Sequence, residues 1–247
     1  MSLKIATPIT IRVQARDGMF LGPDSYQGAK ILIKDAHNNT VLASGSTNSG
    51  DSGSRSDNYI DDASLFPIIT PAAPQPVIHW VVASDSTVNY TTTLTLSKAT
   101  LLKIEVTIPL PAEQSDQLVT VTQWVEPGQA LTNGAGFVID VPGLWVQPQA
   151  TAQGHSIDVT AKVTMMCGCK IEDGTPWVPA DFDVVARILH AGDEKPIAET
   201  PLSFQSESIY TGQLQAPGSG AYTLLVYALQ HSTTNQGVAR LPLTIEG

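Results

Sequence analysis

The chain contains 247 residues, of which 42% are hydrophobic and 15% are charged, and this composition is typical of a globular protein. Its formal net charge of −10 argues against a nucleic-acid partner, because such a partner needs clustered Lys and Arg to neutralise phosphates. No apolar run approaches the roughly 18 residues that a membrane-spanning helix requires, so we expect no transmembrane segment.

Period-two alternation of apolar and polar residues is the clearest pattern in the first half of the chain. It runs from Ile9 to Arg16 and again from Leu102 to Ile108. Because successive side chains of a strand lie on opposite faces of a sheet, each segment is expected to bury one face. Further strands are expected at Ala29 to Asp35, Thr40 to Ser46, Val77 to Ala83 and Val88 to Leu96.

The segment from Gly45 to Pro76 is expected to be a long loop. As far as Asp62 it consists mainly of Ser, Gly, Asn and Asp, and the prolines that follow cannot occupy a central strand. Such an insertion is where a sandwich would place a binding surface. Four of its carboxylates suit calcium if the fold brings them together: Asp51, Asp57, Asp61 and Asp62. A solvated acidic loop is the simpler interpretation, because no EF-hand spacing is present.

A second set of strands is expected after the Val141-Pro142-Gly143 turn. The alternation from Ile157 to Thr164 begins it, and the run from Tyr222 to Leu229 is apolar at both parities, which favours a central strand. We therefore predict an all-β chain of two immunoglobulin-like β-sandwich domains in tandem, at residues 4–148 and 149–245. Residues 1–3 and 246–247 are interpreted as remnants of an expression vector.

Turn and strand motifs near both ends of the chain carry a family resemblance: Ala15 to Gly18, Gly28 to Asp35, Val41 to Thr47, Gly220 to Ala228 and Asn235 to Gly237. They resemble the opening strands and the closing hairpin of bacterial immunoglobulin-like and carboxypeptidase-regulatory-like β-sandwiches. This resemblance implies architecture and no particular activity, because the superfold hosts many functions. The run from Thr164 to Cys169, with Pro176-Trp177, is similar to a group of uncharacterised exported proteobacterial proteins with a Met-Met-Cys-Gly-Cys motif.

Met166, Cys167 and Cys169 form the densest chemical cluster, and their sulfurs suit copper or zinc. Extending the preceding strand by period two places both cysteines on its core-facing side. The pair is expected to form a disulfide only if Gly168 bends the backbone, because residues i and i+2 of an extended strand lie at the long limit of disulfide geometry. A short-loop disulfide, reduced core thiols and a metal or redox site remain as alternatives.

Trp124 and Trp177 are candidates for stacking on a sugar ring. Trp124 shares its parity with neighbouring threonines and points away from the apolar face of its strand, and Trp177 lies in a turn-rich loop. Packing against the other domain is the alternative for both side chains.

The function expected from these features is a non-catalytic exported module that binds a partner protein or a glycan through its loops. The alternative is a periplasmic metal or redox protein that uses Cys167-Gly168-Cys169, and a third is a hydrolase with no recognisable motif. No cofactor is expected, with copper and calcium as the weaker alternatives. The abundance of Thr, Ser, Gln and Asn favours a periplasmic or secreted location.

Overall fold

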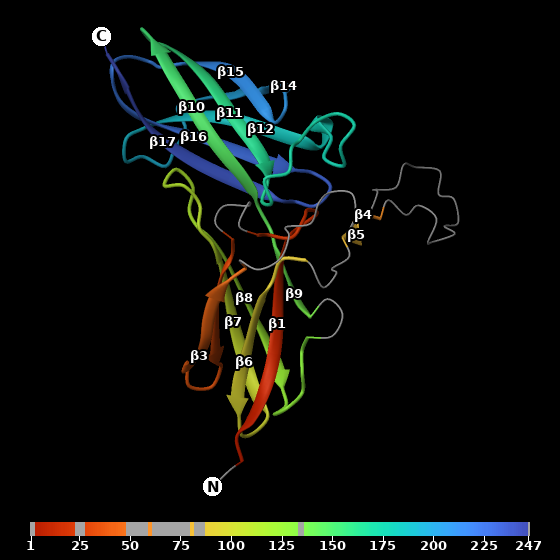
Figure 1. Ribbon diagram of the computed structural model, residues 1–247. Coiled ribbons are helices and arrows are strands. Elements are labelled where there is room, and N and C mark those ends of the chain that lie inside the picture. Colours follow the sequence, from red (N-terminus) through yellow and green to blue (C-terminus); the bar gives the residue numbers. More distant parts are fainter. Residues whose placement is uncertain are drawn as a thin grey trace. The chain divides into compact units, whose positions relative to one another are not determined.

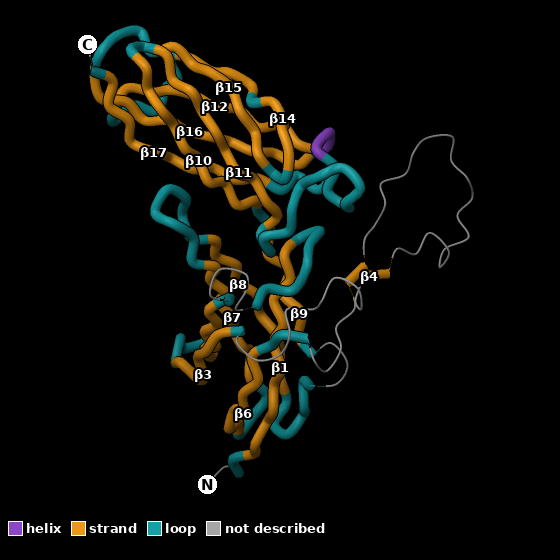
Figure 2. The backbone as a smooth tube through the Cα atoms, turned by 45° about the horizontal axis from the view of Figure 1, so that its top comes forward, coloured by secondary structure: helices purple, strands orange, loops and turns teal. Residues whose placement is uncertain are grey.

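The computed structural model describes residues 3–22, 28–47, 59–60, 80–81, 87–132 and 136–246. Contacts divide the chain into two compact units: Met1–Pro109 with Asp116–Val141, and Leu110–Ser115 with Pro142–Gly247. Strands build both units, and the helix present among the described residues is the single turn η1, Pro179–Asp181 (Figures 1 and 2). The prediction of an all-β chain with two β-sandwich domains is confirmed.

Two sheets form the first unit. The smaller sheet has the order β6 (Tyr90–Leu96), β1 (Ile5–Ala15), β9 (Phe137–Val141), and β1 is antiparallel to β6 but parallel to β9. The larger has the order β3 (Val41–Ser46), β2 (Lys30–Asp35), β7 (Thr100–Ile108), β8 (Gln117–Val125), all antiparallel. A further pair, β4 (Tyr59–Ile60) and β5 (Trp80–Val81), stands apart from these sheets.

The core of the first unit comes from the alternating residues that the sequence indicates. Ile9, Ile11 and Val13 of β1 are fully buried, and Ile104 of β7 is 1% exposed. The alternation predicts one buried face for β1, whereas Arg12 on its other face is also only 3% exposed. β1 is thus enclosed on both faces.

The second unit also has two sheets. One has the order β10 (Leu144–Gln153), β11 (Ser156–Met165), β15 (Ile209–Gln215), β14 (Ser203–Ser206). The other has the order β13 (Ala198–Pro201), β12 (Phe182–His190), β16 (Gly220–Gln230), β17 (Gln236–Ile245). When the eight strands from β10 to β17 are lettered A, B, C, C′, D, E, F and G in chain order, the two sheets have the strand orders ABED and C′CFG. These are the sheets of an immunoglobulin domain.

Strand β16 lies between β12 and β17, as the apolar run from Tyr222 predicts. One parity, which includes Leu224 and Val226, is fully buried. The other parity, which includes Leu225 and Tyr227, is only half-buried. A two-layer sandwich explains the difference, because each sheet turns one face to the core and the other outward.

The two units divide between Val141 and Pro142 along this part of the chain, whereas the sequence-based boundary lies between residues 148 and 149. Strand β10 runs through Pro148 without a break and pairs with β11 over its whole length. The segment Leu110–Ser115, which connects β7 to β8, is grouped with the second unit.

Candidate functional site

The outer face of the β3-β2-β7-β8 sheet carries the strongest candidate surface. In β8 the residues alternate between half-buried and exposed, and the exposed set is Leu118, Thr120, Thr122 and Trp124. The pleat produces this alternation, because successive side chains of β8 point to opposite faces of the sheet. These four side chains point to the outer face, away from the core. We call the outer face around Trp124 the Trp124 platform, and it comprises Trp124, His37, Leu101, Lys103, Glu105, Lys34, Thr120 and Thr122.

Trp124 is 54% exposed and points outward, as its parity predicts. It lies directly opposite Leu101 in the β7–β8 register. His37 approaches from the β2–β3 turn with its ring edge-on, at 6.1 Å between ring centroids. A hydrogen bond from the Ala36 backbone N–H to the Leu101 carbonyl oxygen, 2.9 Å, ties that turn to β7. The indole is therefore supported along its side while a large part of it stays open to solvent.

Polar groups lie beside the indole on the same face. Glu105 accepts hydrogen bonds from Lys34 at 2.7 Å and from Lys103 at 2.8 Å. These two contacts, first with Lys103 and then with Lys34, lower the pKa of the Glu105 carboxyl below its ordinary value of 4.5. The strand register brings the three residues together, because Lys103 lies opposite Lys34 in β2 and opposite Thr122 in β8. A ligand on the platform would meet an aromatic surface and charged hydrogen-bonding groups.

Trp177, the second stacking candidate, is only 3% exposed. Two hydrogen bonds close its loop. The Glu172 N–H donates to the Trp177 carbonyl oxygen at 3.0 Å, and the Trp177 N–H donates to Thr175 Oγ1 at 3.2 Å. The structure thus buries the Trp177 side chain. Of the two tryptophans, Trp124 is the one whose surface is accessible.

Cys167 and Cys169 are joined by a disulfide, with their Cα atoms 5.4 Å apart. Strand β11 ends at Met165, and Gly168 then takes the left-handed backbone conformation, φ 78°, that the sequence argument required. Its N–H donates to the Met165 carbonyl oxygen at 2.8 Å. Met166 is fully buried in this turn. Because both cysteine sulfurs are bonded to each other, the turn has the chemistry of a closed structural loop.

The four candidate calcium ligands Asp51, Asp57, Asp61 and Asp62 lie outside the described residues, as does most of the Gly45–Pro76 loop. Within the part of the chain that is described, no three His, Cys, Asp or Glu side chains gather in a way that would hold a metal ion. Among the same residues, no helix is long and apolar enough to cross a membrane.

Serine, histidine and aspartate side chains meet on the surface of the second unit, and they test the hydrolase alternative. His231 pairs with Asp183 at 3.0 Å, whereas Ser232 donates its hydroxyl to Asp181 at 2.5 Å. A catalytic triad requires the histidine to accept the serine proton. Here Ser232 donates its proton to Asp181, and His231 pairs with a different carboxylate, that of Asp183. The serine proton is thus not directed to the histidine, and the cluster does not have the arrangement of a catalytic triad.

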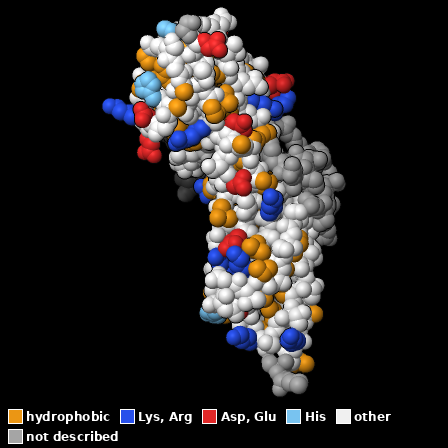
Figure 3. Space-filling model, turned by 90° about the vertical axis from the view of Figure 1, so that its left-hand side faces the viewer, with side chains coloured by type: hydrophobic (Ala, Val, Ile, Leu, Met, Phe, Trp, Pro, Cys, Tyr) orange, Lys and Arg blue, Asp and Glu red, His pale blue; other side chains and the backbone are white. Residues whose placement is uncertain are grey.

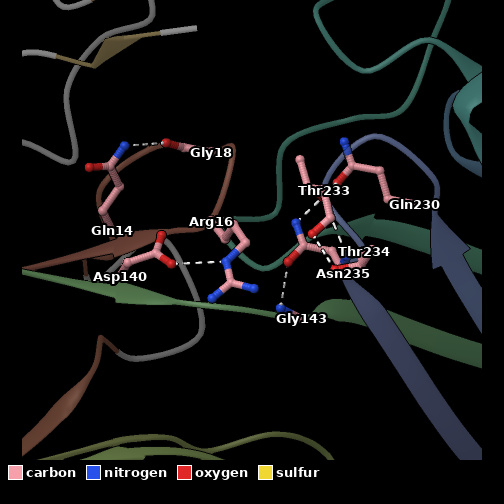
Figure 4. Close-up of polar contacts among 9 residues, drawn as sticks. All are labelled: Gln14, Arg16, Gly18, Asp140, Gly143, Gln230, Thr233, Thr234 and Asn235. Atoms are coloured by element: carbon pink, nitrogen blue, oxygen red, sulfur yellow. Dashed lines mark hydrogen bonds and ion pairs between the residues drawn. The ribbon is translucent and has the colours of Figure 1, made fainter. Parts of the chain in front are cut away.

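Two further polar networks have structural roles (Figure 4). In the first unit Arg16 donates to Asp140 at 3.0 Å. In the second unit the fully buried Asn235 accepts from the Gly143 N–H at 3.1 Å and donates to Gln230 at 3.0 Å. Both ends of the Asn235 amide are used by the protein itself, so this network anchors the turn before β17.

Figure 3 shows one face of the molecule, on which acidic and basic side chains lie intermixed and hydrophobic side chains form small separate groups. The net charge of −10 is therefore not gathered into a single acidic surface on this face. A broad electrostatic attraction for one class of partner therefore does not arise on this face.

Sequence reasoning identified Trp124 but missed the residues around it. His37, Lys34 and Glu105 come from separate segments, and a single sequence does not reveal that they share a face with Trp124. The available signal was the strand pattern: once β2 pairs with β7 and β7 with β8, the parities of Lys34 and Glu105 assign both to the outer face.

No protein-family model and no curated protein matches the chain. Among solved structures, it is similar to a candidate carbohydrate-binding protein from Bacteroides uniformis, with 12% identity and a TM-score of 0.32 over 97% of this chain and 99% of that one. It is also similar to the chicken interferon gamma receptor alpha chain, with 9% identity and a TM-score of 0.37 over the full length of both chains. Likenesses of this size carry no argument about function, which must come from the site itself.

Proposed function

We propose that this protein is a non-catalytic binding module that recognises a glycan through the Trp124 platform. The observation that carries the proposal is the indole of Trp124, which is 54% exposed on a regular sheet face and is supported from the side by His37. An exposed indole offers a large flat apolar surface, and the C–H face of a sugar ring is a flat apolar surface that fits it.

Polar neighbours supply the other half of glycan recognition. The hydroxyl groups of a sugar need directional partners, and Lys103, Glu105 and Thr122 offer donors and acceptors on the same face as the ring. Lys34 and Lys103 already hold Glu105 in place. A preorganised polar group next to an aromatic surface reduces the entropy lost on binding.

We also propose that the protein acts in the periplasm or outside the cell. The Cys167–Cys169 disulfide supports this location, because disulfides persist in oxidising compartments and are rare in the cytosol. The loop between Gly45 and Pro76 remains a second proposed contact region, for a partner protein or for the same glycan.

The test is binding to a glycan array and to insoluble polysaccharides. Trp124→Ala is expected to weaken binding at least about tenfold, the effect of removing an aromatic anchor, while Trp124→Phe retains part of the affinity. Val238→Ala is the matched control, because Val238 is a 40% exposed apolar residue in the second unit. Uniformly blank arrays, or unchanged binding by Trp124→Ala, would overturn the proposal.

A further inference from the structure

We propose that strand β8 is a dimerisation edge, at which a second copy of the chain pairs its own β8 antiparallel about a two-fold axis through Val121. The four-stranded sheets of the two copies would then join into one continuous sheet. The inference rests on the sheet edge; the dimer shares Trp124, Thr120 and Thr122 with the Trp124 platform but does not require that the platform bind a glycan.

The sequence of strand β8 lacks the residues that normally protect a sheet edge. In the described part of the chain it pairs with β7 on one side only, and its nine residues include no charge and no proline. Its pairing with β7 shows no bulge. An edge of this length with regular backbone is a ready template for another strand.

The other edges of the four larger sheets are different. Prolines lie in β10, β13 and β17, register shifts interrupt β3 and β14, and β9 carries Asp140. Strand β6 has none of these devices, but its exposed side chains are the threonines 91, 93 and 95. Strand β8 instead exposes Leu118 at 60% and Trp124 at 54%. Among the described edges, β8 therefore combines an unprotected backbone with large apolar side chains.

The sequence of β8 is self-complementary about Val121. Leu118 and Trp124 are equally far from Val121, so antiparallel pairing places Leu118 opposite the partner's Trp124 on the outer face, twice. Thr120 lies opposite the partner's Thr122 between them. On the inner face Val121 meets the partner's Val121, and this residue is only half-buried in the single chain. The occupant that best fits this edge is thus a second copy of the same strand.

The register gives a charge-swap test. In this pairing, residue 120 of one copy faces residue 122 of the other, in both directions. Thr120→Lys with Thr122→Lys places like charges opposite each other and is expected to weaken the dimer at least about tenfold. Thr120→Lys with Thr122→Glu is the matched control, because it places opposite charges together and should retain the dimer.

Both double variants should fold. Thr120 and Thr122 are exposed, so the introduced charges stay in water. Within the chain Thr120 lies opposite Glu105 and Thr122 opposite Lys103, so the control pairs opposite charges, whereas Thr122→Lys in the Lys/Lys variant faces the like charge of Lys103, which is why the folding check is needed. The measurement is sedimentation equilibrium or light scattering from micromolar to submillimolar concentration, with circular dichroism and thermal melts as a folding check. A concentration-dependent dimer that only the Lys/Lys variant loses supports the proposal.

Three outcomes overturn it. The wild-type protein is monomeric throughout the concentration range, or the Lys/Lys variant dimerises as well as the wild type. The third is that the Lys/Glu and Lys/Lys variants weaken the dimer equally, which would show that the copies associate without the register about Val121. Monomeric protein that still binds a glycan would overturn the dimer and leave the Trp124 platform intact.

Discussion

The buried polar groups of Tyr210 and Asn235 in the second unit differ in their hydrogen bonding. The amide of Asn235 is bonded at both ends. Tyr210 is 2% exposed and packs edge-on against Phe204 at 5.5 Å, yet its hydroxyl has no hydrogen-bond partner among the described residues. Burial raises the pKa of this hydroxyl. An unpaired buried hydroxyl is a cost, which the packing of the ring must offset.

Tyr210→Phe is therefore expected to leave the free energy of unfolding unchanged or to raise it by about 1 kcal/mol, because it removes the unpaired hydroxyl and keeps the ring. Tyr222→Phe is the matched control, since the Tyr222 hydroxyl donates to the Gly218 carbonyl oxygen at 2.9 Å. That variant should lose about 1 kcal/mol. Urea denaturation measures both, and a clear loss of stability in Tyr210→Phe would contradict the expectation.

The Lys34–Glu105–Lys103 cluster gives a pH dependence. Because the pKa of Glu105 in the folded protein is lower than its ordinary value of 4.5, its ion pairs stabilise the fold above that pH. The contribution is lost as the pH falls through the lowered pKa. Glu105→Gln should thus cost a few tenths to about 1 kcal/mol at neutral pH, and the cost should shrink progressively as the pH falls below 4.5. Urea titrations at several pH values test this, and an equal cost at all pH values would refute it.

The disulfide predicts the result of a thiol titration. Denatured protein should show no reactive thiol before reduction and both cysteines after it, and elemental analysis should find no bound copper or zinc. The loop that the disulfide closes is short, so replacing both cysteines by Ser is expected to cost only about 1–2 kcal/mol. Free thiols together with stoichiometric metal would instead revive the metal or redox alternative.

At the scale of elements, the close approach of β10 and β17 shapes the second unit. Gly237 in β17 lies against the Leu144 carbonyl oxygen of β10, and a Cβ there would also come within 2.8 Å of Val146. A backbone oxygen cannot move aside as a flexible side chain can. The glycine is therefore required by packing between two strands that are not paired with each other in a sheet.

Gly237→Ala is expected to destabilise the protein by about 1–3 kcal/mol, because one of the two strands must shift to admit the methyl group. Gly218→Ala is the matched control, since a Cβ at Gly218 would have nothing within 4 Å. Thermal unfolding measures both variants. Equal melting temperatures would show that β10 and β17 can separate at no cost.

At the scale of the whole molecule, the second unit is not one continuous stretch of chain, because it includes Leu110–Ser115. Gln114 in that segment is 9% exposed, and its side chain bonds twice to β10. It donates to the Leu144 carbonyl oxygen at 2.8 Å and accepts from the Val146 N–H at 2.9 Å. A side-chain amide thus takes the place that a neighbouring strand would have beside this part of β10.

Gln114→Ala should lower the free energy of unfolding by about 2–3 kcal/mol, because two backbone groups of β10 lose their partners in a buried setting. Gln205→Ala serves as the control, since its side chain bonds to the Ser203 carbonyl oxygen at 3.2 Å on the exposed surface. Denaturant unfolding compares them. If both substitutions cost the same small amount, Gln114 has no special part in the second unit.

The sequence by itself determined the strands with clear alternation and, for most of them, which side chains alternate between the core and the surface. Both properties follow from the pleat, which is local, and this is why the alternation placed Trp124 at the surface and Ile9 in the core. It also showed that Gly168 must bend the chain if the two cysteines are to meet.

Only the tertiary structure decided which strands are neighbours. It placed β9 parallel to β1, enclosed Trp177, and brought His37, Lys34 and Glu105 to the face of Trp124. These relations depend on strand order and register between segments far apart in the chain. Packing and loop closure over the whole unit determine these relations, and the spacing of residues within one segment does not predict them.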